Sequence, residues 1–412
     1  MLSQIASLAL GLSAPVTVFE NGLWWTGESF EPRTVHVEGS HFVEPDNREP
    51  QERVDLDGAY VVPPYCDAHA HSIGRSPQLP EITGQYLAEG VFYVREIGNF
   101  PPYRAELDAR LAAASAPDLA FTGAPLTAPG GHPVEVYQRL QQYAGLFGEL
   151  VWEEMDGTAF HQLPDQDSFE RAWPGILATQ PAAIKVHLLY SEAFEARRDH
   201  PQTVGQRGLD PALLPEIVAR AHAAGIPVLA HVETAADFRN AIAAGVDEIA
   251  HMPGYNGPSV GPYDRALTDE DAEAAAAAGV VVHTTLSFAA GLESRNPERY
   301  AATRDLQQAN LARLVEAGVT LVVGSDDYSD TSVDEVAYLS GLDVLEPAHL
   351  LTMWTSNCTQ AVFPDRQIGH LQPGHEASFL VLEGDPLADF EQTRAIREAW
   401  REGVRIQGGG PE

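Results

Sequence analysis

Residues 213–251 read LLPEIVARAHAAGIPVLAHVETAADFRNAIAAGVDEIAH and contain one pattern twice. Each half begins with a helical run that ends in glycine, at Gly225 or Gly245. A short apolar run follows and ends in histidine, at His231 or His251. Glycine after the last helical turn supplies the left-handed residue that closes a helix. Because short apolar runs are typical of strands buried on both faces, the segment predicts two successive α–β units.

The same pattern continues on both sides of this segment. Downstream, TDEDAEAAAAAG leads into VVVHTT, and LQQANLARLVEAG leads into VTLVVGSDD; Thr268 and Asp271 resemble a capping box. The upstream strand candidates are YCDAHAH, VFYVREIG, DLAFTGAPL and AAIKVHLL. Successive α–β units predict a parallel sheet, and eight strand candidates are the number that closes a TIM-like (β/α)8 barrel. An open doubly wound sheet is the alternative, but no G-x-G-x-x-G follows a strand.

The sequence pattern at both ends of the chain differs from that of the central α–β repeat. Short alternating segments, among them VTVF, LWW and TVHVEG, are separated by turn signals such as Asn21-Gly22, Gly39-Ser40 and Asp57-Gly58, and similar segments return after the central repeat. We therefore expect an α/β chain in which both termini build one small β-sandwich. The expected parts are residues 1–62 (sandwich, after a short N-terminal extension), 63–365 (barrel) and 366–412 (sandwich).

The composition excludes several classes of partner. Lys and Arg total 25 against 59 Asp and Glu, so the formal net charge is −34, which should repel nucleic acid and anionic membrane surfaces. A small-molecule substrate, with possible homo-oligomers, fits better. Residues 2–14 are apolar but lack a basic segment before them, so we expect a cytoplasmic location, with export as the alternative. Cys66 and Cys358 cannot build a disulfide framework, and we expect two small buried apolar residues.

Lysine occurs once in the 412 residues, at Lys185, and the other 24 cations are arginine. Arginine replaces lysine wherever charge alone is needed, so a single surviving lysine indicates amine chemistry that a guanidinium cannot perform. The options are a Schiff base, a general base or a carbamate formed with carbon dioxide. The alternative is that neutral drift removed all other lysines and that the remaining one has no special role.

Residues that can bind metal recur at the ends of the predicted strands. The set comprises His69, His71, Lys185, His231, His251 and Asp326. Catalytic groups of a barrel lie at the carboxyl ends of its strands. Neutral imidazole and carboxylate oxygen are preferred zinc ligands, so the set predicts a metal site.

These motifs resemble the amidohydrolase superfamily over essentially the whole chain. The H-x-H motif appears as His69-Ala70-His71, the barrel lysine in Ala183–Val186, the further histidines in Leu229–His231 and Ile249–His251, and the aspartate in Gly324–Asp326. Gly130-Gly131-His132 and Val94-Arg95-Glu96 resemble the prolidase-like and imidazolonepropionase-like branch. Cys66 and Ser378 depart from the residues usual in the family, but neither is an expected ligand.

The resemblance implies a binuclear centre with a carboxylated lysine. Two divalent ions, expected to be zinc, would be bridged by a carbamate on Lys185. His69, His71 and Asp326 would hold one ion, and His231 and His251 the other. A metal-bridging hydroxide would attack the substrate, with Asp326 as the proton carrier. Asp327 is a weaker candidate for that proton transfer.

The implied activity is hydrolysis of an amide or peptide-like C–N bond in a small molecule, for example a dipeptide or an N-acyl amino acid. Two alternatives stay open: the same site acting as a lactonase, esterase or phosphotriesterase, and a non-catalytic binding relative. Weaker candidates for substrate contacts are His132, His187, Tyr190, Arg95, Tyr255 and Tyr328, with His283 as a further option. Residues 137–174 form the longest excursion, that is, the longest segment between two predicted strands. We interpret it as a pocket wall, a lid or an oligomer contact.

Overall fold

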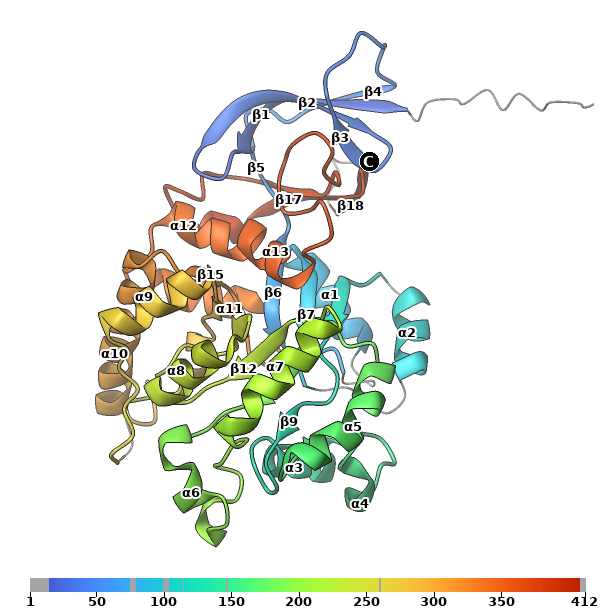
Figure 1. The fold of residues 1–412 in the computed structure, drawn as a ribbon. Helices are drawn as coiled ribbons and strands as arrows, with labels where there is room; N and C mark the ends of the chain where they lie inside the picture. Colours follow the sequence, from blue (N-terminus) through green and yellow to red (C-terminus); the bar gives the residue numbers. More distant parts are fainter. Residues whose placement is uncertain are drawn as a thin grey trace, which may run out of the picture. The chain divides into compact units, whose positions relative to one another are not determined.

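The computed structural model describes residues 15–74, 79–98, 104–113, 115–145, 147–258 and 261–407 (Figure 1). The apolar segment considered above as an export signal lies outside these residues. The chain divides into two compact units. One contains Met1–Pro63 and His370–Glu412, and the other is Pro64–Gly369.

The first unit is a sheet built from both ends of the chain. The strand order is β18-β17-β16-β5-β1-β2-β3, and β4 pairs with β1. Phe19, Trp24, Phe379 and Trp400 pack in its core, with the Phe19 ring 5.0 Å from that of Phe379 and 4.9 Å from that of Trp400. The strands are β1 (Val16–Trp25), β2 (Phe30–Glu38), β3 (His41–Val43), β4 (Glu52–Asp55), β5 (Tyr60–Val62), β16 (Phe379–Leu382), β17 (Ile396–Arg401) and β18 (Val404–Gln407).

One turn signal in this unit is not a turn. The sequence predicts that Asn21-Gly22 separates two strands, and this is wrong, because β1 runs through both residues. Asn21 has φ 58°, and the register with β2 shifts between Phe19 and Gly22. A bulge accommodates the left-handed residue without ending the strand. At Asp57 and Gly58, φ is 51° and 75°, as expected for a tight turn.

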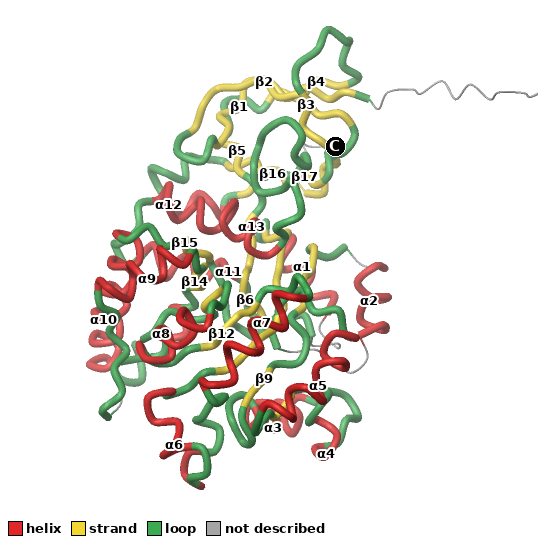
Figure 2. The backbone as a smooth tube through the Cα atoms, in the orientation of Figure 1, coloured by secondary structure: helices red, strands yellow, loops and turns green. Residues whose placement is uncertain are grey.

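The second unit alternates strands with helices (Figure 2). Each of the eight strand candidates contains a strand. The strands are β6 (Tyr65–Ala70), β7 (Val91–Glu96), β8 (Asp118–Phe121), β9 (Leu126–Thr127), β10 (His161–Gln162), β11 (Ile184–His187), β12 (Val228–His231), β13 (Glu248–Ile249), β14 (Val281–His283) and β15 (Thr320–Val322). The helices are α1 (Leu79–Ala88), α2 (Arg104–Ala113), α3 (Val134–Ala144), α4 (Trp152–Met155), α5 (Gln166–Ala178), α6 (Phe194–Arg197), α7 (Leu214–Ala223), α8 (Ala235–Ala244), α9 (Asp269–Ala278), α10 (Pro297–Glu316), α11 (Ser332–Ser340), α12 (Pro347–Thr352) and α13 (Cys358–Val362).

The predicted helix signals occur where the sequence places them. Thr268 accepts a hydrogen bond from the Asp271 backbone N–H in a complete capping box at the start of α9. Gly245 and Gly279 close α8 and α9 with φ of 82° and 67°. Each of these glycines lies directly before the next strand segment, so the left-handed residue redirects the chain back toward the sheet.

The strands of this unit pair in parallel, which confirms the predicted α/β architecture. One sheet has the order β6-β7-β8 and the other the order β10-β9-β11-β12-β13-β14-β15. Further backbone hydrogen bonds link β6 and β8, the two edge strands of the three-stranded sheet, to segments of the seven-stranded sheet. The Ala68 N–H donates to Val323 O at 2.9 Å, the Asp326 N–H donates to His69 O at 2.7 Å, and the Ala182 N–H donates to Phe121 O at 2.8 Å.

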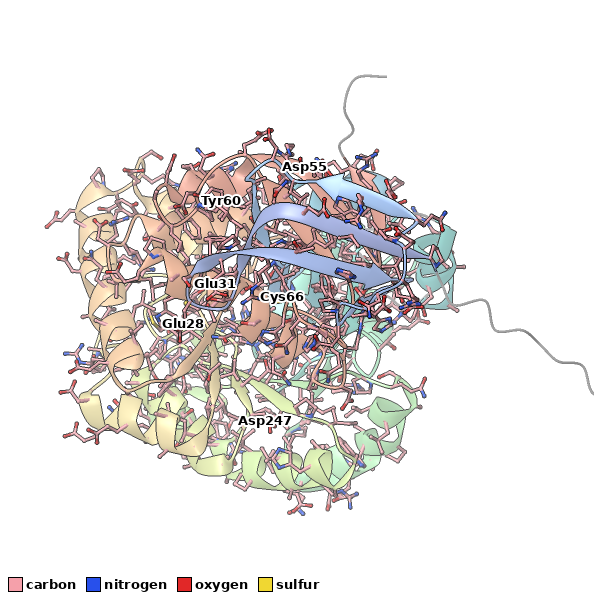
Figure 3. All side chains as sticks on the ribbon, turned by 90° about the horizontal axis from the view of Figure 1, so that it is seen from above. Glu28, Glu31, Asp55, Tyr60, Cys66 and Asp247 are labelled. Atoms are coloured by element: carbon pink, nitrogen blue, oxygen red, sulfur yellow. A yellow bond between two sulfur atoms is a disulfide. The ribbon has the colours of Figure 1, made fainter. Side chains whose placement is uncertain are left out.

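The excursion predicted over residues 137–174 forms α3, α4, β10 and part of α5. It packs around its own apolar cluster, which includes Tyr137, Phe147, Met155 and Phe160. Charged side chains occupy the outside of both units, among them Glu28, Glu31 and Asp55 in the first and Asp247 in the second (Figure 3). Within the described part of the chain, no helix is long and apolar enough to cross a membrane.

Candidate metal centre

The end of β6 places the H-x-H motif in the interior of the second unit. β6 is buried throughout, and residues two apart on a strand project from the same face. The Asp67 carboxylate accepts from the backbone N–H of His69 at 3.1 Å and from that of Ser325 at 3.0 Å, which ties β6 to the segment after β15. A Cβ at Gly324 would lie 2.5 Å from His69 Cβ, so only glycine allows this close approach.

Asp326 lies directly against both histidines of the motif. Its Oδ1 is 3.0 Å from His71 Nε2 and 3.3 Å from His69 Nε2, and its Oδ2 is 3.8 Å from His251 Nδ1. Burial alone would raise the pKa of Asp326, but His251, His69 and His71 hold it well below the ordinary value. Asp326 is also a non-glycine residue with φ 51°. Strained backbone of this kind clusters at functional sites.

Lys185 is on β11 and is almost completely buried, with 2% of its surface exposed. Its Nζ has no hydrogen-bond partner among the described residues. Burial lowers the pKa of Lys185 to about 7, although Asp326 and Glu248 oppose the shift. An unpaired buried amine is costly unless it is neutral or modified, so the environment fits amine chemistry at neutral pH.

The remaining predicted ligands complete the cluster. His231 ends β12, and His251 follows β13. The His231 and His251 rings are 4.4 Å apart, and the His69 and His251 rings are 4.6 Å apart. Burial lowers the pKa of both His69 and His251 well below the ordinary value. Both imidazoles are therefore neutral at physiological pH, which is the form that binds metal.

The donor atoms fit divalent cations. His69, His71 and Asp326 each offer an atom within 4.8 Å of the others, and His132, His187 and His231 form a second such group. Two imidazoles with a carboxylate, and three imidazoles, are both zinc-type donor sets. The second group includes two histidines that the sequence indicated only as weak substrate contacts.

A cavity of about 250 Å³ opens onto these residues. Ten residues predicted from the sequence line it, six as ligands and four as substrate contacts; they are His69, His71, Lys185, His231, His251, Asp326, His132, His187, Tyr255 and Tyr328. The rest of the wall is largely apolar and includes Ile97, Val136 and Phe288. Tyr137 also lines the cavity, so the excursion over residues 137–174 contributes to the pocket wall.

Arg95 and Tyr190 are not in the cavity lining. Arg95 is fully buried, with Nη1 2.5 Å from Glu248 Oε2, and His283 Nε2 is 2.7 Å from the same oxygen. Burial would raise the pKa of Glu248, but Arg95 and His283 lower it to about 2. The Tyr190 ring lies 4.9 Å from that of Tyr263 in a tilted arrangement, and the Tyr190 hydroxyl accepts a hydrogen bond from Arg265 Nη2 at 3.4 Å. Arg95 and His283 therefore form a buried ion-pair network rather than cavity contacts.

A second buried network lies beside His231, and the sequence analysis missed it. Glu233 Oε1 is 3.4 Å from His231 Nε2, and Glu233 accepts from Tyr255 Oη at 3.0 Å and from Arg265 Nη2 at 2.9 Å. Burial would raise the pKa of Glu233, but His231 and Arg265 lower it to about 2. The spacing of two residues from His231 was an available signal, whereas Arg265 comes from a loop with no motif.

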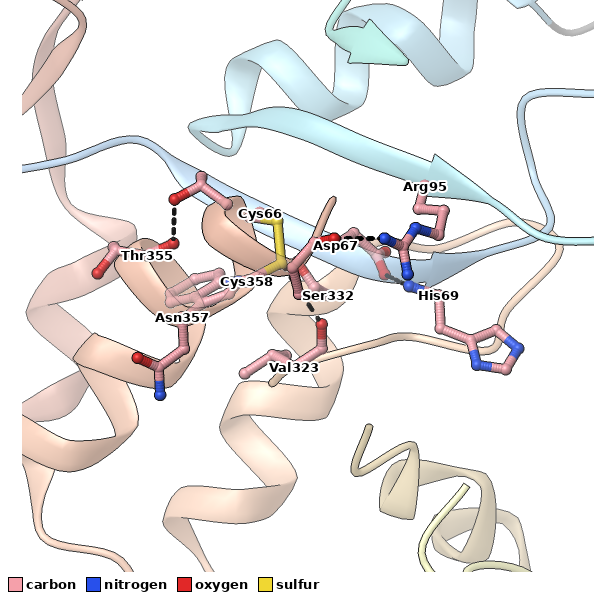
Figure 4. Close-up of a disulfide and its surroundings, with 12 residues drawn as sticks. Cys66, Asp67, His69, Arg95, Val323, Ser332, Thr355, Asn357 and Cys358 are labelled. Atoms are coloured by element: carbon pink, nitrogen blue, oxygen red, sulfur yellow. Dashed lines mark hydrogen bonds between the residues drawn. A yellow bond between two sulfur atoms is a disulfide. The ribbon is translucent and has the colours of Figure 1, made fainter. Parts of the chain in front are cut away.

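Cys66 and Cys358 form a disulfide between β6 and the start of α13, with a Cα–Cα distance of 5.8 Å (Figure 4). The expectation of two separate apolar residues is therefore wrong. The two cysteines are 292 residues apart, and only tertiary packing brings α13 against β6. Cys66 directly precedes Asp67, so the disulfide anchors the strand that carries His69 and His71.

Comparisons with known proteins identify the family and the fold. The sequence model of the amidohydrolase family matches residues 122–407. Among solved structures, an amidohydrolase is 22% identical with a TM-score of 0.74, covering 96% of this chain and 100% of its own. The ochratoxinase of A. niger is 20% identical with a TM-score of 0.75, covering 97% of each chain. A prolidase complexed with N-methylphosphonate-L-proline is 19% identical with a TM-score of 0.74, covering 96% of this chain and 100% of its own.

These similarities define the class of protein. The structural neighbours share the fold, and the family match spans more than half of the chain. The chain belongs to the amidohydrolase family and is a hydrolase acting on carbon–nitrogen bonds. A search of curated proteins found no match.

Proposed function

We propose that this protein is a metal-dependent amidohydrolase that cleaves the C–N bond of a small-molecule amide. The observation that supports this best is the group of His69, His71 and Asp326, whose donor atoms all lie within 4.8 Å of one another beside buried Lys185. Family membership indicates the class of reaction, and this donor group indicates that the reaction depends on a metal ion.

We also propose that the two parallel sheets close into a (β/α)8 barrel. The bonds from Ala68 to Val323 and from Asp326 to His69 join the first strand to the segment after the last. The bond from Ala182 to Phe121 joins the segment before β11 to β8, the other edge strand of the three-stranded sheet. Closure would bring the carboxyl ends of all strands to one rim, where the barrel fold places active sites.

The proposed centre would hold two divalent ions, zinc by donor type. His69, His71 and Asp326 would hold one, and His231 and His251 the other, and a carbamate on Lys185 would supply further oxygen ligands. Such ions lower the pKa of water and polarise the scissile carbonyl. The family match and the donor groups support metal binding, and the partnerless Nζ of Lys185 supports its modification.

The chain's own residues orient the substrate and move the proton. Asp326, ionised because its pKa is held low, accepts the proton of the attacking water at a carboxylate oxygen and delivers it to the leaving amine. Tyr255 and Tyr328 flank the cavity, and the Tyr328 ring stacks on His71 at 5.0 Å. The largely apolar wall excludes bulk water, which strengthens the electrostatic interactions inside.

The substrate is proposed to be a dipeptide or an N-acyl amino acid. Because Arg95 pairs with Glu248, it does not offer the substrate contact that the sequence suggested. A direct test compares kcat/KM for an N-acyl amino acid and for its neutral carboxamide. A preference for the acid supports the proposed substrate class, and a preference for the carboxamide restricts the site to neutral amides.

The reaction is tested with panels of amides, lactones, esters and phosphotriesters, each with and without a chelator. We expect chelator-sensitive turnover of amides, at least tenfold faster than of the other classes. Lys185→Ala should lose activity and regain part of it with a small carboxylate and added metal. Full activity in Lys185→Arg, or chelator-resistant turnover, would contradict the proposed centre.

The disulfide indicates which cellular compartment the protein occupies. Disulfides persist in oxidising compartments and are rare in the cytosol, so the Cys66–Cys358 bond favours export over the cytoplasmic location expected from the sequence. We therefore propose an oxidising compartment. Alkylation of the denatured protein, trapped directly from its native cells, should show two blocked thiols before reduction and two reactive thiols afterwards. Reactive thiols before reduction would restore the cytoplasmic expectation.

A further inference from the structure

A second cavity, of about 650 Å³, adjoins the one that contains the predicted ligands. We call the cavity of about 250 Å³ the inner cavity and the larger one the outer cavity. The two share two wall residues, Asp326 and Phe288. Asp326 belongs to the first donor group, whereas Phe288 contributes no donor atom. A substrate bound at the donor group can therefore extend past Phe288 into the outer cavity.

Phe288 presents an exposed ring between the two cavities. Its exposed fraction is 60%, whereas Leu286 and Ala289 of the same segment are fully buried. The Phe288 ring lies 5.8 Å from the Tyr255 ring, which stacks on His251 at 4.4 Å. The three rings thus run outward from a predicted ligand, and Phe288 is the outermost. An aromatic substrate group at this place would cover apolar surface that is otherwise exposed to water.

The backbone before Phe288 is held in place by two buried side chains. The Glu335 carboxylate accepts from the Leu286 backbone N–H at 2.8 Å and from that of the next residue at 2.6 Å. The Gln307 amide donates to Tyr255 O at 2.9 Å and to Leu286 O at 3.3 Å, which ties the two segments together. Because this backbone is fixed, the ring is positioned before a substrate binds, and binding costs less conformational entropy.

We propose that Phe288 is a specificity-determining residue, which selects amides with an uncharged aromatic acyl group that lies against its ring and extends into the outer cavity. The inference rests on the proposed function and narrows its substrate class. Aromatic pairs in edge-to-face or offset contact gain free energy beyond the burial of apolar area. The outer cavity offers further rings to such a group, because Tyr300 and Tyr338 line it.

The charge of the outer cavity favours the acyl end of the substrate. Its wall includes the carboxylates of Glu293, Asp327, Asp330 and Asp334 and the guanidinium of Arg295. This excess of negative charge repels an anion. In an N-acyl amino acid the carboxylate belongs to the amine side of the scissile bond. The neutral acyl group is therefore the part of the substrate that fits the outer cavity.

The test compares two substrates that differ only in the acyl group. We measure kcat/KM for N-phenylacetyl-L-alanine and N-acetyl-L-alanine with the parent, Phe288→Ala and Tyr143→Ala. The parent should prefer the phenylacetyl substrate, and Phe288→Ala should reduce the ratio of the two kcat/KM values by about tenfold. Tyr143→Ala is the matched control, because its ring is 80% exposed and lines neither cavity, and it should keep the parental ratio. An unchanged ratio in Phe288→Ala would overturn the proposal.

A binding measurement separates this inference from the proposed reaction. In the ketomethylene analogue of N-phenylacetyl-L-alanine, CH₂ replaces the amide N–H, so the analogue cannot be hydrolysed, and calorimetry gives its Kd. Phe288→Ala should raise this Kd by about tenfold, and Tyr143→Ala should not change it. A Kd that rises in Phe288→Ala while the parent hydrolyses no amide would support the role of Phe288 and contradict the proposed function. Amide hydrolysis with an unchanged Kd and ratio would do the reverse.

A second variant guards against loss of folding. Circular dichroism compares Phe288→Ala with the parent. If Phe288→Ala unfolds, Phe288→Leu replaces it, because leucine keeps an apolar side chain and removes only the ring. The ratio of the two kcat/KM values should again fall and the Kd of the analogue should again rise. Parental values of both in folded Phe288→Leu would overturn the proposal.

Discussion

Asp326 is the central residue of the first donor group, which consists of His69, His71 and Asp326. Its carboxylate contacts both histidines of the H-x-H motif, and its backbone N–H bonds to His69 O. Asp327, the alternative proton carrier, instead accepts from the Ser329 and Asp330 backbone N–H groups of its own loop. The structure thus distinguishes two adjacent carboxylates that the sequence leaves side by side.

Replacing Asp326 by Asn should reduce kcat by about 10²–10⁴-fold, because the amide cannot accept the proton. Asp327→Asn, the matched control, should stay within about tenfold of the parent, because its carboxylate serves the loop. Steady-state kinetics on the best amide of the panel gives both values. Comparable kinetics for Asp326→Asn and the parent would remove Asp326 from the reaction.

Lys185 should react with carbon dioxide at neutral pH. The neutral amine is the reactive form, and burial lowers the pKa of Lys185 from 10.5 to about 7. The neutral fraction therefore rises as pH increases through about 7, whereas an exposed lysine would need pH above 10. Metal-free, CO₂-depleted protein should regain activity with bicarbonate and zinc at pH 8 and far more slowly at pH 6. A rate of reactivation that is flat between these pH values would contradict the low pKa.

At the scale of elements, the local signals were reliable, and the turn signal at Asn21-Gly22 was the exception. Glycine and capping residues act within a few positions, so the starts and ends of α8 and α9 could be predicted. The two-residue strands β9 and β10 were not predicted, because their pairing depends on partners far along the chain. The disulfide was missed for the same reason.

The disulfide should stabilise the element pair β6–α13. Cys66→Ala/Cys358→Ala should lower the free energy of unfolding by about 2–5 kcal/mol, because the bond restricts the unfolded chain. Denaturant unfolding with and without reductant measures this. The parent in reductant should approach the double variant, and the double variant should not respond to reductant. A parent insensitive to full reduction would show that the bond contributes little.

At the scale of the whole molecule, the net charge of −34 is the dominant property. Like charges on a folded protein repel and destabilise the folded state, and salt screens this repulsion. The melting temperature should therefore rise as NaCl increases from about 10 mM to 150 mM, where the Debye length falls to about 8 Å. Scanning calorimetry measures it, with sucrose as a control for water activity. A melting temperature that falls with salt would indicate that attractive ion pairs dominate.

The sequence by itself determined the α–β repeat, the parallel sheet and the donor set, because periodicity, capping and strand-end position are local properties. Ten of the candidate residues, including all six predicted ligands, line one cavity. Only the tertiary structure decided that Arg95 pairs with Glu248, that Cys66 bonds to Cys358, and that His132 and His187 join His231. Each of these contacts joins segments that are far apart in the sequence. Because separation along the chain does not indicate distance in space, only the packed structure reveals which residues meet.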